Sequence, residues 1–301
     1  MRKLIIIVSI LSLILLFAAC SDVKSTGVSN TNETGTNGSQ ISENTNMAEP
    51  VNTQAVKNSG TTEPAITAEP TSTAKPAGAR LPKAEAVLKA KIIQLNEKSM
   101  LIAGTDAADL YTVTSTDAIF DAGNKSADAS ALKPGQNVEI GYSGAILESY
   151  PAQLGKPIYI KITDQGDDMV GFYKTVLNDL WNVDNGLNSD ISVLAFDLSK
   201  VTNLNDAEKS ALVYVVSGSH SLQGIMGTFD ELREQGYIDK DKLYFETGIL
   251  FKLELTDVTK NSFSFKAEKW RSGLGAYYFL DCRAVKNDAG WSYTIGHEAI
   301  S

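Results

Sequence analysis

Apolar and polar residues alternate in short runs over residues 83–165, and each run is typical of a β-strand. The alternation predicts strands at residues 86–94, 100–103, 110–114, 136–142 and 158–162. Turn-forming residues separate them at 96–99 and at 132–135, where Pro134 takes the second position of the turn. Five short strands in one segment of this length predict a small antiparallel β-barrel of OB-like size.

A different period begins after residue 165. Apolar residues recur at helical spacing from Asp167 to about Trp181, which predicts an amphipathic helix. Asn205 followed by Glu208, and Thr228 followed by Glu231, are capping-box patterns that predict the starts of two more helices.

Strand patterns follow the helices. A short apolar run covers residues 191–196, and longer strands are predicted at 249–255, 263–265, 276–285 and 291–295. The order predicts that residues 166–301 form an α+β domain with its helices on one face of a curved antiparallel sheet. The outline is similar to cystatin-like and NTF2-like folds, a similarity of topology that carries no function.

The first twenty residues have the layout of a secretory signal peptide. Arg2 and Lys3 precede an apolar run, and the run ends in Ala18-Ala19-Cys20. The ending resembles the lipobox of bacterial lipoproteins, with Phe17 where that family usually has Leu. The resemblance implies that residues 1–19 are removed and that Cys20 carries diacylglycerol at the outer face of the cell membrane. An ordinary cleaved signal and a retained anchor are the alternatives, although the run is shorter than the roughly 20 residues of a membrane span.

Residues 20–82 are predicted to be a linker that bears the lipidated cysteine. Ser, Thr, Asn, Gly, Ala and Pro dominate, and no aromatic residue occurs between Phe17 and Tyr111. Such a stretch cannot bury enough apolar surface to fold. The net charge is -9, and it becomes -11 after removal of residues 1–19, which hold two basic residues and no acidic one. An acidic chain is a poor partner for nucleic acid, whose binding depends on neutralising phosphates.

The barrel segment carries a second resemblance. Leu132-Lys133-Pro134-Gly135 with Val138, and then residues 148–153 (Glu-Ser-Tyr-Pro-Ala-Gln), are similar to an uncharacterised small β-barrel family of Gram-positive lipoproteins. The resemblance covers about eighty residues of this chain and implies no activity.

Few residues suggest a metal site or a nucleophile. His220 and His297 are the only histidines and lack the spacing of zinc ligands, so we assign no metal to them. Residues 184–190 are rich in oxygen ligands and would hold calcium or form a simple loop. Cys282 has no partner once Cys20 is lipidated, and it is either a buried inert thiol or a reactive nucleophile.

Residues 269–278 are the most distinctive segment of the second domain. Two glycines flank Leu274, where two strands join or bend. The side chains around them supply stacking faces and a bidentate donor for a ligand or partner: Trp270, Arg271, Tyr277 and Tyr278. In that case Arg271→Ala leaves folding intact and weakens binding. The alternative is a hairpin whose aromatic side chains pack in the core.

Four carboxylates lie on or near the predicted strands and would include a general acid–base pair if the fold brought two of them together: Asp197, Glu254, Glu268 and Asp281. Spacing does not establish such a pair, so we assign no catalytic residue and no cofactor. The sequence favours a membrane-anchored binding module with an unidentified protein or small-molecule partner. A secreted carboxylate-dependent hydrolase with a cavity in the C-terminal domain is the alternative, and a structural envelope component is a third.

Overall fold

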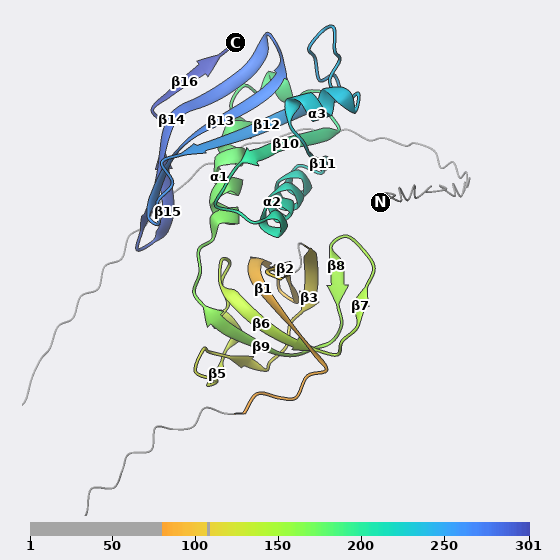
Figure 1. Cartoon of the computed structure of the whole chain (residues 1–301), viewed down its shortest axis with the longest axis vertical. Coiled ribbons are helices and arrows are strands. Elements are labelled where there is room, and N and C mark those ends of the chain that lie inside the picture. Colours follow the sequence, from red (N-terminus) through yellow and green to blue (C-terminus); the bar gives the residue numbers. More distant parts are fainter. Residues whose placement is uncertain (1–79, 107–108) are drawn as a thin grey trace, which may run out of the picture. The chain divides into compact units, whose positions relative to one another are not determined.

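The computed structural model describes residues 80–106 and 109–301. The predicted signal peptide, Cys20 and nearly all of the linker lie outside these residues. Within them, no helix is long and apolar enough to cross a membrane. The fold is α+β, with two sheets and three α-helices in the described ranges (Figure 1).

The first sheet has nine strands in the order β5-β4-β9-β6-β1-β2-β3-β8-β7 and is strongly curled (Figure 1). The five predicted strands are confirmed as β1, β2, β3, β6 and β9. The strands are β1 (Ala86–Leu95), β2 (Ser99–Gly104), β3 (Leu110–Thr114), β4 (Ile119–Phe120), β5 (Ser126–Ala127), β6 (Asn137–Tyr142), β7 (Ile146–Leu147), β8 (Ala152–Leu154) and β9 (Pro157–Asp164).

The sequence predicted a wholly antiparallel sheet, and this prediction is wrong for two pairs of strands. β3 pairs with β8 in parallel, and β4 pairs with β9 in parallel. Both parallel ladders join segments far apart in the chain, because parallel neighbours need a long connection. The four short strands absent from the prediction have two or three residues each, too few to display an alternating pattern.

The second part begins with α1 (Met169–Asn182), which matches the predicted helix. A 3-10 turn η2 (Asn185–Asn188) and β10 (Val193–Lys200) follow it. Next come α2 (Asp206–Ser219), β11 (Gln223–Met226) and α3 (Phe229–Glu234). Both predicted capping boxes are present at the starts of α2 and α3.

The remaining strands form a meander: β12 (Gly248–Thr256), β13 (Ser262–Ser272), β14 (Gly275–Asn287), β15 (Gly290–Thr294) and β16 (His297–Ile300). The sheet order is β11-β10-β12-β13-β14-β15, and β16 also pairs with β14. The meander is antiparallel as predicted. The prediction of an antiparallel sheet is wrong at the other edge, where β10 lies parallel to both β11 and β12. The cause is α2 and α3, which return the chain to the same end of the sheet after each strand.

The prediction that the helices cover one face of this sheet is wrong for α3, because the helices pack on both faces. α1 and α2 pack on the face that presents Leu194, Phe196 and Phe251, in one large core cluster. α3 contributes Leu232 to a smaller cluster on the opposite face, against Val193 and Ala195. The large cluster also contains Leu101 and Leu110 of the first sheet. The large cluster therefore extends from the helices onto one side of the first sheet. Most other buried side chains of the first sheet, among them Ile92, Ile102 and Ile140, form a core of their own.

Candidate functional site

The segment 269–278 forms the hairpin between β13 and β14. Ser272 pairs with Gly275, which leaves Gly273 and Leu274 at the tip, and the Leu274 side chain is 93% exposed. In the ladder Lys269 lies opposite Tyr277, and Glu268 lies opposite Tyr278. Because side chains alternate between faces, Trp270 and Tyr278 share one face of the sheet while Tyr277 belongs to the other. The four residues predicted as ligand contacts are therefore not gathered at one point.

Arg271 is engaged inside the protein. One terminal nitrogen, Nη1, donates to the carbonyl oxygens of Leu187 (2.9 Å) and Ser189 (2.7 Å), and Nη2 donates to that of Glu246 (3.0 Å). The guanidinium also lies over the Tyr244 ring, 5.6 Å from its centre. The planar guanidinium group thus links residues 187–189 to Glu246. Arg271 therefore stabilises the fold, in addition to any role in binding.

The Lys269 ammonium group binds oxygen atoms of the loop 184–190, which the sequence suggested as a calcium site. This ammonium group is fully buried. It donates to the carbonyl oxygens of Trp181 (3.2 Å), Val183 and Asp184 (3.1 Å) and to Oδ1 of Asn188 (3.2 Å). These acceptors include the last carbonyls of α1, where a cation is favoured by the helix dipole. Burial lowers the pKa of Lys269 to about 8, partly offset by Asp184. The loop 184–190 therefore receives its cation from within the chain.

The two histidines lie in separate settings. His220 stacks on Trp181 with ring centres 4.0 Å apart, and its Nε2 donates a hydrogen bond to Oδ1 of Asn178 at 3.2 Å. Burial lowers its pKa. His297 pairs with Asp281 through Nδ1 and Oδ2 at 3.2 Å. In the described ranges, no group of three or more His, Cys, Asp and Glu side chains is arranged to bind a metal ion.

Cys282 is buried in the large core cluster. Burial, reinforced by the charge of Asp281, raises the pKa of its thiol to about 11. A thiol with this pKa is almost fully protonated at neutral pH, and the thiolate is the reactive form. The position therefore has the properties of an inert core residue.

A row of charged side chains crosses the face of the second sheet that also carries Trp270. Asp197 of β10 is in register with Lys252 of β12, Lys252 with Glu268 of β13, and Glu268 with Tyr278 of β14. The next row along joins Lys200, Glu254 and Lys266. We call these residues, with Trp270, the charged face. It unites three of the four candidate carboxylates with two of the four predicted contact residues, whereas Asp281 is exposed beside His297.

The charges of this face are partly withdrawn from solvent. Lys252 and Glu254 form an ion pair at 2.6 Å, which raises the pKa of the lysine and lowers that of the glutamate. Burial raises the pKa of Glu268 against the opposing effect of Lys266 and Lys252. The Lys266 ammonium lies 5.5 Å from the centre of the Tyr278 ring. Half-buried charges next to aromatic rings are typical of functional surfaces.

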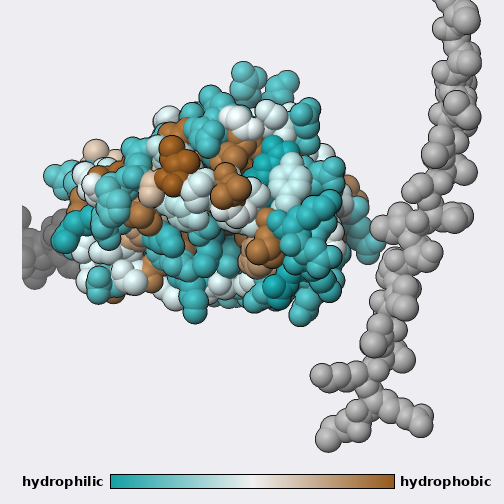
Figure 2. Space-filling view, turned by 90° about the horizontal axis from the view of Figure 1, so that it is seen from above, coloured by the Kyte–Doolittle hydropathy of each residue, from teal (hydrophilic) through white to brown (hydrophobic). Residues whose placement is uncertain are grey.

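Figure 2 looks down on the end of the molecule that carries the β13–β14 hairpin, β16 and the loop after α3. Brown hydrophobic residues form small groups there between hydrophilic ones (Figure 2). The exposed apolar side chains of these segments are Leu243, Leu274 and Ile300. This end therefore offers apolar contacts interspersed with polar groups rather than one continuous apolar face.

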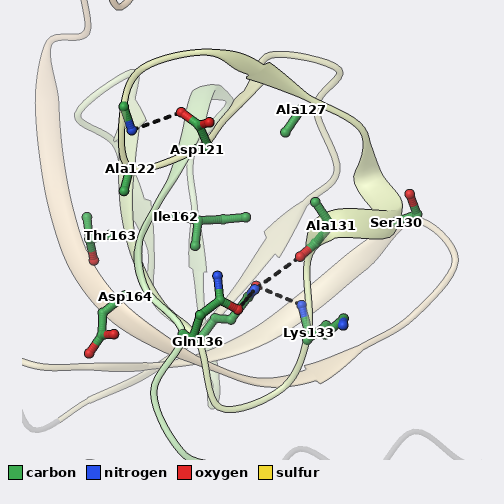
Figure 3. A pocket seen from close by; sticks show the side chains of 12 residues that line it. Asp121, Ala122, Ala127, Ser130, Ala131, Lys133, Gln136, Ile162, Thr163 and Asp164 are labelled. Carbon is green, nitrogen blue, oxygen red and sulfur yellow. Dashed lines mark hydrogen bonds between the residues drawn. The ribbon is translucent and has the colours of Figure 1, made fainter.

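The first sheet has an open hollow of about 610 Å³ beside the 132–136 turn (Figure 3). Gln136 in its wall is buried, and its Nε2 donates to the Ala131 carbonyl (3.1 Å) and to Oε1 of Gln165 (2.9 Å). Its Oε1 accepts from the Lys133 amide at 2.8 Å. Asp121 accepts from the amides of Gly123 (2.9 Å) and Lys125 (2.8 Å). These polar groups hold loops in place, which makes the hollow a weaker candidate than the charged face.

Sequence reasoning missed the lysines of the site. The signal for Lys269 was present, because strict alternation from Phe263 through Phe265 and Ala267 puts position 269 on the core face. Lys252 and Lys266 had no such signal, since their importance comes from the register of three strands.

No protein-family model matches this chain, and no curated protein is significantly similar to it in sequence. The assignment of function therefore rests on the residues and geometry described above.

Proposed function

We propose that this protein is a lipid-anchored binding module at the outer face of the cell membrane. The anchor is Cys20, and its support is the sequence around it: a basic start, an apolar run and two alanines before the cysteine. Two acyl chains hold a protein on a membrane where one chain is marginal. Cys20→Ser releases the protein into the medium or blocks its processing. A Cys20→Ser protein of mature size that stays fully in the membrane fraction would contradict the anchor.

The finer folds are part of the proposal. The first sheet is an OB-like barrel, supported by the antiparallel pairs of β1 with β2 and β6 and by the parallel pairs β3–β8 and β4–β9. The second part is a variant of the cystatin-like or NTF2-like outline, supported by the antiparallel meander β12–β15 under α1. Its parallel edge strands β10 and β11 are an addition to that outline.

The charged face is the binding surface, and the register of Asp197, Lys252, Glu268 and Tyr278 is the observation that carries this assignment. α3 covers one part of this face, and the charged groups lie beside it. Charged groups that are half-buried on a sheet face are costly unless they serve stability or binding. Tyr278 adds aromatic surface, which contributes strongly to binding energy at interfaces. Trp270 packs against Phe229 of α3 at the edge of this face. The partner is a protein or a small molecule and not a nucleic acid, since the chain carries a net charge of -9.

Photo-crosslinking in intact cells tests this surface. A photoreactive phenylalanine analogue replaces Tyr278 in one variant and Tyr150, an exposed tyrosine of the first sheet, in a second. Position 278 is expected to yield a discrete crosslinked species that position 150 does not yield. A species captured only from position 150 would move the binding surface to the barrel, and the proposal would fail.

A carboxylate-dependent hydrolase is the second candidate, favoured by the common face of Asp197 and Glu268. They are two strands apart, so their backbones are separated by about 10 Å. Inverting glycosidases hold their two carboxyl groups about 6.5–9.5 Å apart, so this candidate requires the two side chains to lean toward each other. Glu268 also has a raised pKa, as a general acid requires. If an activity is found, Glu268→Gln must abolish it while Glu254→Gln leaves it largely intact. An activity unchanged by Glu268→Gln would exclude this candidate.

A further inference from the structure

A small hollow of about 180 Å³ lies at one end of the charged face, where β10 and β11 end. Residues from both strand ends line it, and so do residues from the first turns of α2 and α3. The wall consists of Phe196, Asp197, Leu198, Ser199, Asp206, Lys209, Met226, Gly227, Thr228 and Glu231.

The topology makes this place distinct. β10 lies between β11 and β12 and is parallel to both. α2, which leads from β10 to β11, packs on one face of the sheet, and α3, which leads from β11 to β12, packs on the other. The connections therefore diverge at the carboxyl end of β10. Such a switch point is where open sheets with parallel strands commonly bind ligands.

Asp197 gives the hollow its chemistry. Its side chain is 6% exposed, and its Oδ1 accepts from the Ser199 amide (3.1 Å) and the Ser199 hydroxyl (2.6 Å). Among the described residues, the hydrogen bonds to this carboxylate go to Oδ1 and no ion pair includes it. Oδ2 is not one of the fully buried atoms that lack a partner, so it faces the open side of the hollow. Lys252, its neighbour across the ladder, is paired with Glu254 instead. The accessible oxygen of this carboxylate is therefore available to a positively charged group of a ligand.

The other residues that line the hollow indicate which kind of cationic group fits it. Asp206 and Glu231 add two carboxylates, against a single lysine, Lys209. Glu231 Oε2 accepts from the Thr228 amide and hydroxyl in the α3 capping box, so this carboxylate contributes charge rather than a free ligand atom. These side chains are not arranged as metal ligands among the described residues. Phe196 and Met226 contribute apolar surface suited to an alkyl chain. At about 30 Å³ per water, a hollow of about 180 Å³ accommodates roughly six non-hydrogen atoms.

We propose that this hollow binds a primary ammonium group on an alkyl chain, with the ammonium on the Asp197 carboxylate. The inference rests on the proposed binding function and names the chemistry of the partner. The ammonium belongs either to a lysine side chain of a peptide or to a free alkylamine, and the two sources share this chemistry.

Amide NMR of the full chain in detergent micelles tests the proposal. The probes are n-pentylammonium, the amide of Nα-acetyl-lysine, and n-pentanol as the uncharged control. Both ammonium compounds are expected to shift the amides of residues 197–199 and 226–228 in a saturable way, and n-pentanol is not. Tighter binding of the lysine derivative identifies a peptide as the source, and tighter binding of n-pentylammonium identifies a free amine.

Three variants test whether the ammonium group binds at the Asp197 carboxylate or is attracted only by the overall negative charge of the protein. Asp197→Asn keeps the shape of the side chain and is expected to weaken ammonium binding at least about tenfold, which corresponds to about 1.4 kcal/mol. Asp230→Asn removes one charge from α3 outside the hollow and is expected to change affinity less than about twofold. Lys209→Met removes the repelling charge and is expected to tighten binding about threefold, a readout that survives if Asp197→Asn fails to fold.

The proposal is overturned if neither ammonium compound shows saturable binding, if n-pentanol binds equally well, or if Asp197→Asn folds and binds normally. Crosslinking from position 278 is an independent result. If it persists while the ammonium compounds fail, the charged face remains the binding surface and only the chemistry assigned to the hollow is wrong.

Discussion

Lys91 of β1 forms a salt bridge with Glu208 of α2, and this pair joins the first sheet to the helices of the second. Glu208 is also the third residue of the α2 capping box, where its Oε2 accepts from the Asn205 amide at 2.9 Å. The buried Glu208 carboxylate thus caps the N-terminus of α2 and also pairs with Lys91 of the first sheet. Leu101 and Leu110 of the first sheet also pack in the large core cluster beside α1 and α2, so both apolar and charged contacts join the first sheet to the helices.

Lys91→Ala is expected to lower the free energy of unfolding by about 2–3 kcal/mol, because it leaves the buried Glu208 carboxylate without its cation. Lys89→Ala, on an exposed position of the same strand, is the matched control and should change it by less than about 0.5 kcal/mol. Chemical denaturation measures both. Equal effects of the two substitutions would show that the pair does not couple the two parts.

The double variant Lys91→Met with Glu208→Gln should recover most of the lost stability. Methionine packs like the lysine stem without a charge, and glutamine still reaches the Asn205 amide in the capping box. If the double variant is less stable than Lys91→Ala, unpaired charge is not the cause of the destabilisation.

Arg271→Ala is expected to destabilise the protein by about 2–3 kcal/mol, since it removes charge-assisted hydrogen bonds to three carbonyl groups. This reverses the expectation from sequence that folding would be unaffected. Hydrogen exchange should accelerate at residues 187–189 and around Glu246, and the exposed Arg283→Ala should leave these segments unchanged. Unaltered exchange in both variants would restore Arg271 as a free contact residue.

Lys269 is expected to make stability depend on alkaline pH. Its pKa falls from an ordinary 10.5 to about 8 in the folded protein. Between these values the unfolded chain binds more protons than the native state, so stability rises with pH there, by up to about 3 kcal/mol. The measurement is the difference in free energy of unfolding between the wild-type protein and Lys269→Met. This difference should grow in favour of the wild type from pH 8 to 10.5. A difference that is flat with pH would mean that the ammonium is not buried.

Cys282 should resist alkylation in the native protein. Its burial and a thiol pKa of about 11 both suppress the thiolate. Iodoacetamide near pH 8 should modify it at least about a hundredfold more slowly than in concentrated guanidinium chloride, as followed by peptide mass. Comparable rates in the two conditions would identify an accessible thiol.

Local patterns in the sequence predicted local structure well. The spacing of Phe172, Val176 and Leu180 marks α1, and the capping boxes mark the starts of α2 and α3. β11 was not predicted, because its four residues are too few to show a period. The parallel edge of the sheet was therefore not predicted either. The charged face depends on the register between Asp197, Lys252 and Glu268, which is a non-local property. Likewise, the acceptors for Lys269 come from the end of α1 and the loop after it, more than eighty residues upstream.

The proposed binding module lies outside the cell, and a partner covers its charged face together with the hollow at the end of that face, where Met226 lies. Two cysteine variants test this proposal in one labelling experiment: Met226→Cys, which lines the hollow at 47% exposure, and Val258→Cys, at 45% exposure in the turn between β12 and β13. A membrane-impermeant maleimide should label both positions in purified protein. In intact cells we predict labelling at position 258 and protection at position 226. No labelling at position 258 in intact cells, or equal labelling of the two positions there, would contradict the account.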